Sequence, residues 1–140
     1  MNTTNKKLFL AFSFVFIFIL FACSAENGIH IIDAKTAIGI DEKLMPIKVT
    51  GNFPKDASKV FCWFQWRDAE PDTEIMATWN YVTDNVHILD YTFAIPRKAG
   101  SGSVSLSMPE NKTLPPGLYR VALKTGKQTL KSVGFTVSDK

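Results

Sequence analysis

The sequence predicts an all-β protein built as a single sandwich of about seven to eight short antiparallel strands. After Ile29 the chain lacks the sustained 3.6-residue periodicity of an amphipathic helix. Residues 103–108 alternate strictly, so that Val104, Leu106 and Met108 share one face and three serines share the other. Turn-forming residues separate such segments at short intervals, as is typical of sandwiches and barrels.

The expected strands follow one another through the whole chain after the N-terminal segment. In order they are 29–40, 44–50, 59–67, 73–82, 86–95, 103–108, 118–124 and 130–137. Gly39 and Asp41 separate the first two, a loop at 68–72 precedes the fourth, and 83–85 forms a short hairpin connection. We expect 101–103 to be a flexible loop. It is not a nucleophile elbow, because Ser-Gly-Ser here lacks the strand–turn–helix context that an elbow needs.

A proline-glycine turn precedes Tyr119 and refines this prediction. Pro116 presets φ and Gly117 tolerates positive φ, which predicts a type II turn. The run Leu114-Pro-Pro-Gly-Leu-Tyr119 resembles the approach to strand F in fibronectin type III and related immunoglobulin-like domains. The resemblance implies an immunoglobulin-like β-sandwich over residues 29–140, in which the phenol of Tyr119 bonds back to nearby backbone.

The N-terminal residues have the three zones of a secretory signal peptide. Lys6 and Lys7 give a positive start, residues 8–22 form an unbroken apolar run, and the small residues 23–25 follow. The run has 15 residues, fewer than the roughly 20 that a helix needs to cross a bilayer. An uncleaved membrane anchor and ordinary secretion after a cut at Ala25 are the alternatives to a lipid anchor.

The end of this segment, Leu20-Phe-Ala-Cys23, resembles the lipobox of bacterial lipoproteins. The resemblance implies that residues 1–22 are a cleaved signal peptide and that the thiol of Cys23 carries acyl groups such as palmitate. Residues 23–28 would then be a short tether to the lipid bilayer. Ser24 after the cysteine implies sorting to the outer membrane of the bacterial cell envelope, by similarity to lipoproteins of enteric bacteria.

Charge and cysteine content exclude some classes of function. Removing residues 1–22 removes two lysines and no acidic residue, so the formal net charge falls from +3 to +1. No dense Lys/Arg cluster remains, and we expect no nucleic-acid partner. Cys62, the other cysteine, lies among large apolar residues, which predicts a buried inert thiol. A reactive or intermolecular cysteine is the alternative.

The two histidines give no catalytic or metal-binding pattern. Asp33 follows His30 by three residues, and Asp90 follows His87 by three. In an alternating strand this spacing places the two side chains on opposite faces. We therefore expect His87 to be a histidine at the rim of the fold, and we expect no metal, no cofactor and no enzymatic activity.

Strand 59–67 carries aromatic residues on both faces, although one face of a sandwich strand meets water. Val60, Cys62, Phe64 and Trp66 form one face, and Phe61, Trp63, Gln65 and Arg67 form the other. One interpretation is that a neighbouring loop or the opening strand covers Phe61 and Trp63. The other is an exposed aromatic patch beside Arg67 that binds a partner.

These observations predict a non-catalytic binding or accessory module that meets an envelope protein close to the membrane. The five residues 24–28 let the domain stand roughly 20 Å from its anchor, at 3.3–3.6 Å per residue. The candidate contact residues are Phe61, Trp63 and Arg67. Binding of a carbohydrate or cell-wall polymer through the same aromatic strand is the alternative, and an enzyme is a remote one.

Overall fold

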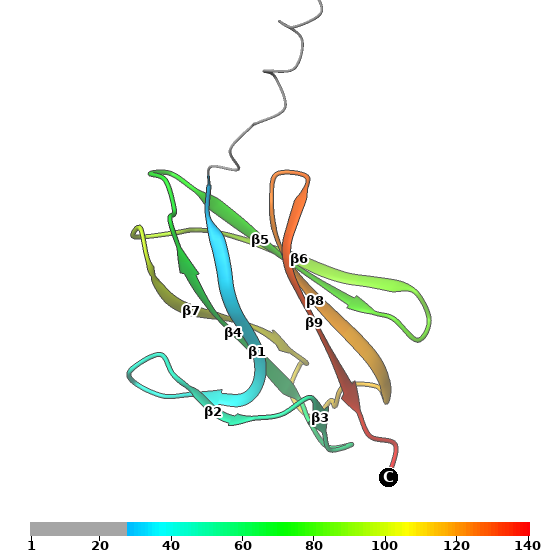
Figure 1. Ribbon diagram of the computed structural model, residues 1–140. Helices are drawn as coiled ribbons and strands as arrows, with labels where there is room; N and C mark the ends of the chain where they lie inside the picture. Colours follow the sequence, from blue (N-terminus) through cyan, green and yellow to red (C-terminus); the bar gives the residue numbers. More distant parts are fainter. Residues whose placement is uncertain (1–27) are drawn as a thin grey trace, which may run out of the picture.

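The computed structural model describes residues 28–140, which form two β-sheets and no helix (Figure 1). This part of the chain therefore holds no helix that could span a membrane. The predicted signal peptide and Cys23 lie outside the described residues. Of the tether predicted at 23–28, only Gly28 is described. The strands are β1 (His30–Ile40), β2 (Pro46–Val49), β3 (Asn52–Phe53), β4 (Lys59–Arg67), β5 (Glu74–Tyr81), β6 (Val86–Ala94), β7 (Gly100–Ser107), β8 (Gly117–Thr125) and β9 (Gln128–Val137).

The two sheets contain four and five strands. Their strand orders are β2-β1-β4-β7 and β3-β9-β8-β5-β6. The opening segment contributes to both sheets, since β1 pairs with β4 in the first and β3 pairs with β9 in the second. The β3–β9 pair is parallel and the other pairs are antiparallel, so the expectation of antiparallel strands throughout is wrong at this pair.

The strand that was expected to begin at residue 103 begins at Gly100 instead. The expectation of a flexible loop at 101–103 is wrong, because this segment pairs residue by residue with the end of β4. Gly100 lies opposite Trp66 and Gly102 lies opposite Phe64. A Cβ atom on Gly102 would lie 3.3 Å from Cζ of Phe64, so the glycines make room for the two rings rather than loosening the chain.

The core lies between the sheets and is largely aromatic. The Tyr119 and Phe135 rings stack with centroids 5.0 Å apart, and Trp79 meets Phe135 edge-on at 6.1 Å. Such geometries each add roughly 0.5–1.5 kcal/mol beyond the area buried. Cys62 is fully buried in the same core, as expected, and this burial raises the pKa of its thiol to about 12.

The turn before β8 contains the hydrogen bond that the tyrosine motif implied. The Tyr119 hydroxyl donates to the Pro115 carbonyl at 2.5 Å, and burial raises the pKa of that phenol to about 12. Tyr81 donates in the same way to the Pro116 carbonyl. Gly117 has positive φ as expected, but its value of 143° lies far from the +80° of a type II turn. The predicted bond from the Tyr119 phenol to nearby backbone, known as a tyrosine corner, is confirmed, whereas the predicted type II turn is wrong.

Candidate functional site

Trp63 is buried, so the expectation of an exposed patch that includes this residue is wrong. Only 5% of it is accessible, although it points away from the core between the sheets. Its indole Nε1–H donates to the Leu44 carbonyl at 2.7 Å. Leu44 has a φ of 59°, a conformation that costs an ordinary residue roughly 1–2 kcal/mol. The loop between β1 and β2 therefore folds back over the tryptophan, which was the other interpretation of this strand.

Phe61 and Arg67, the other two candidate contact residues, do not join into one surface. Phe61 is half-buried, and the Lys59 ammonium lies 4.7 Å from its ring centroid. Arg67 is exposed at the far end of β4, with its Nε 3.6 Å from the Asp68 carboxylate. Because Trp63 between them is covered, the strand offers no continuous aromatic face.

The covering hairpin itself carries the exposed apolar surface. Leu44, Met45, Ile47 and Val49, here called the hairpin patch, are 47, 47, 44 and 54% exposed. They are four of the nine large apolar residues that are exposed among residues 28–140. Pairing of Val49 with Ala37, and of Ala37 with Phe61, places Val49 on the outer face of the four-stranded sheet, and Ile47 shares that face by strand alternation. Strand alternation indicated an apolar side for β2 but could not show that this side faces solvent.

His87 and Asp90 share a face, contrary to the expectation from their spacing. The His87 Nε2 atom lies 2.9 Å from Oδ1 of Asp90. A register shift in the β5–β6 pair inserts one extra residue, Ile88, and this bulge reverses the alternation between the two side chains. The hydrogen bond from His87 lowers the pKa of Asp90, and a further contribution comes from Thr78. Both partners of the pair are exposed, and His87 lies at the rim of the fold as expected.

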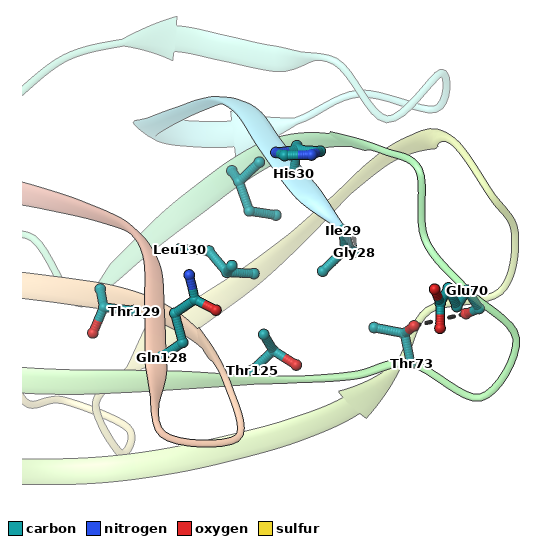
Figure 2. Close-up of a pocket in the computed structure, with 10 residues that line it drawn as sticks. Gly28, Ile29, His30, Glu70, Thr73, Thr125, Gln128, Thr129 and Leu130 are labelled. Atoms are coloured by element: carbon teal, nitrogen blue, oxygen red, sulfur yellow. Dashed lines mark hydrogen bonds between the residues drawn. The ribbon is translucent and has the colours of Figure 1, made fainter. Parts of the chain in front are cut away.

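A cavity of about 580 Å³ lies at the end of the sandwich where the described chain begins. Gly28 and His30 line one side, and the start of β9 lines another (Figure 2). Glu70 and Thr73 lie apart from His30 across the opening, and the Thr73 hydroxyl donates to the Glu70 backbone carbonyl at 2.6 Å. Within residues 28–140 no group of three or more His, Cys, Asp or Glu is placed to hold a metal ion. No ion pair joins two titratable side chains among the described residues that line this cavity.

Comparison with known proteins adds a likeness of fold. No protein-family model matches the chain, and no curated protein matches its sequence. Part of an alkylpurine DNA glycosylase from Pseudomonas fluorescens superposes with a TM-score of 0.49 and 13% identity, over 81% of this chain and 31% of that one. An immunoglobulin-like protein from Pseudomonas aeruginosa superposes with a TM-score of 0.56 and 15% identity, over 82% of this chain and 100% of that chain. Together with the two sheets and the tyrosine corner, this likeness identifies residues 28–140 as an immunoglobulin-like β-sandwich.

Proposed function

We propose that this protein is a lipid-anchored module of the bacterial envelope that binds another envelope protein through the hairpin patch without catalysing a reaction. The observation that carries the proposal is the concentration of exposed apolar side chains on one short hairpin. Solvent-exposed apolar groups that cluster in this way are typical of surfaces that a partner covers. Charged side chains at Asp41, Glu42, Lys43 and Lys48 surround the patch, as in the polar rim of many interfaces.

The anchor rests on the sequence before the described residues. The apolar run 8–22 is too short to span a bilayer and ends at the lipobox-like Cys23. Dual acylation would hold the domain stably on a membrane. The short segment 24–28 would then keep the sandwich within roughly 20 Å of the lipid, which favours an integral membrane protein or a neighbouring lipoprotein as the partner.

The carbohydrate alternative loses the feature that suggested it. The alternative was based on the aromatic strand 59–67, yet Trp63 and Trp66 of that strand are only 5 and 3% exposed. The hairpin patch is aliphatic and carries no ring on which a sugar could stack. Protein binding is therefore the function that we propose.

Photo-crosslinking in the native envelope tests the partner. A benzophenone amino acid in place of Met45 should give a discrete adduct, and one in place of Lys127, in the β8–β9 turn, should not. Val49→Asp should abolish the adduct. Leu118→Asp, which changes a residue of similar exposure (42%) on β8, should leave it intact. An adduct that survives Val49→Asp would contradict the assignment of the surface.

Metabolic labelling tests the anchor separately. The wild-type chain should incorporate labelled palmitate and sediment with membranes. Cys23→Ser should lose the label and either accumulate as an uncleaved precursor or appear as a soluble protein. A wild-type chain that takes up no palmitate and remains soluble would refute lipidation at this residue.

A further inference from the structure

We propose that the free edge of β7 accepts an extended segment of another polypeptide as an added β-strand. The added strand would become the fifth of the four-stranded sheet and would extend the cover over the inner face of β6. This surface is separate from the hairpin patch, because β7 and β2 lie at opposite edges of their sheet. The proposal thus goes beyond the function proposed above and does not depend on it.

The backbone groups of four serines form this free edge. β7 pairs with β4 through eight consecutive residue pairs without a register shift. Just beyond β7, the Met108 N–H donates to the Ser58 carbonyl at 2.8 Å. Since strand hydrogen bonds alternate, even-numbered residues of β7 bond to β4 and odd-numbered residues face away. The outward residues are Ser101, Ser103, Ser105 and Ser107, and among residues 28–140 no strand pairs with them.

The other sheet edges carry features that discourage strand addition, and β7 has none of them. β2 contains Pro46 and an exposed Lys48 with a φ of 52°. β3 has only two residues and is followed by Pro54. β6 carries the bulge at Ile88 and an exposed aspartate. Charges, prolines, bulges and short length are the usual protections of sheet edges. β7, with the sequence Gly-Ser-Gly-Ser-Val-Ser-Leu-Ser, contains no charge, no proline and no bulge.

The inner face of β6 is covered only in part by the opposite sheet, because Phe93 packs against Phe64 of β4 at 5.5 Å between ring centroids whereas Tyr91 is exposed. Tyr91 and Phe93 pair in register with Ala77 and Ile75 of β5, so they point toward the space between the sheets. The two β5 residues are 0% exposed, whereas Tyr91 is 56% exposed. The Tyr91 and Phe93 rings stack with centroids 5.9 Å apart. Tyr91 therefore lies outside the cover that the four-stranded sheet provides, and an added strand beside β7 would extend that cover toward its ring.

The occupant that fits is a single extended segment with alternating side chains. Its inward residues would be apolar and contact Tyr91, and its outward residues would be small or polar beside the β7 serines. A second copy of this chain does not fit. The inward side chains of a second copy's β7, Val104 and Leu106, are already buried in that copy's own core, so they are not free to cover Tyr91.

A synthetic peptide tests the proposal with the full-length chain in detergent. The probe Lys-Thr-Val-Thr-Leu-Thr-Val-Thr-Lys has the required alternation, and a version with N-methylated threonine amides cannot pair. Backbone hydrogen exchange should slow at least tenfold at Ser103 and Ser105 on saturable binding of the first peptide, and should not change with the second. Absence of saturable binding would overturn the proposal. The proposal would also be overturned if, in the free protein, the amides of these serines already exchange as slowly as the amide of Val104.

Variants separate edge pairing from other modes of binding. Ser103→Pro removes an outward N–H without breaking a bond to β4 and should weaken peptide binding at least tenfold, whereas Ser103→Ala keeps the N–H and should bind normally. Tyr91→Ser should also weaken binding, and it supplies the test if Ser103→Pro fails to fold. Val49→Asp in the hairpin patch should have no effect. Equal binding by Ser103→Pro, or a dimer in sedimentation that Ser103→Pro dissociates, would overturn the proposal as stated.

Discussion

Replacing Gly117 by valine should destabilise the sandwich by about 3–5 kcal/mol. The residue has a φ of 143°, a glycine-only region that costs other residues about 1–3 kcal/mol. An added Cβ atom would lie 2.6 Å from both the Thr83 Oγ1 atom and the Tyr81 hydroxyl oxygen. Thr83 Oγ1 accepts a hydrogen bond from the Leu118 N–H, and Tyr81 donates to the Pro116 carbonyl. Displacing both groups adds about 1 kcal/mol for each lost bond.

Urea denaturation measures this effect against a matched control. With a slope of about 1.5 kcal/mol per M, the midpoint for Gly117→Val should fall by about 2–3 M. A Cβ atom on Gly51 would have no heavy atom within 4 Å, and its φ is not in the positive region. Gly51→Val should therefore shift the midpoint by no more than about 0.3 M, the range of an ordinary surface change. Equal shifts in the two variants, or none at Gly117, would refute the reasoning.

Three further outcomes follow from the described side chains. Trp63→Ala should cost about 3–5 kcal/mol in urea denaturation, whereas a wild-type midpoint would mean that the indole is not covered. With its pKa raised to about 12, the Cys62 thiol should resist alkylation at pH 7 until urea unfolds the protein, as followed by mass spectrometry; equal rates with and without urea would contradict its burial. The hydrogen bond from His87 lowers the folded pKa of Asp90 below the ordinary aspartate pKa of 3.8. The stabilisation from this pair is thus present above that pH and lost as pH falls through the folded pKa. In an NMR titration the carboxyl midpoint should rise in His87→Ala, and an unchanged midpoint would argue against the pair.

The strands were predictable where local patterns and tertiary structure agree. β4 matches its predicted bounds, 59–67, because its flanks are polar and its interior is apolar except for Gln65. β3 was missed because two residues cannot establish an alternation, and only their pairing with β9 makes them a strand. The segment with Gly100 and Gly102 was predicted as a loop because glycine is rare within strands. The rings that occupy the space beside these glycines lie on β4, which is distant in the sequence.

The interaction surfaces depended on long-range placement that local periodicity does not encode. Trp63 and Phe61 were recognisable as an anomaly, but the cover over Trp63 comes from a loop 19 positions earlier in the chain. The single extra residue at Ile88 could not be inferred from an otherwise regular strand, and it was enough to reverse the relation of His87 to Asp90. The free edge of β7 is a property of sheet order, and sheet order became visible only in the folded chain.

The fit between the glycines of β7 and the rings of β4 constrains how this sequence can vary. A Cβ atom at position 100 would lie 3.1 Å from the Trp66 ring and 3.3 Å from Cδ of Arg97, so an alanine there requires the ring to shift by a few tenths of an ångström. A smaller residue at position 66 alone would leave a void beside the glycine. The side chains at the two positions therefore share one space, and we expect them to covary among related sequences although they are 34 positions apart in the chain.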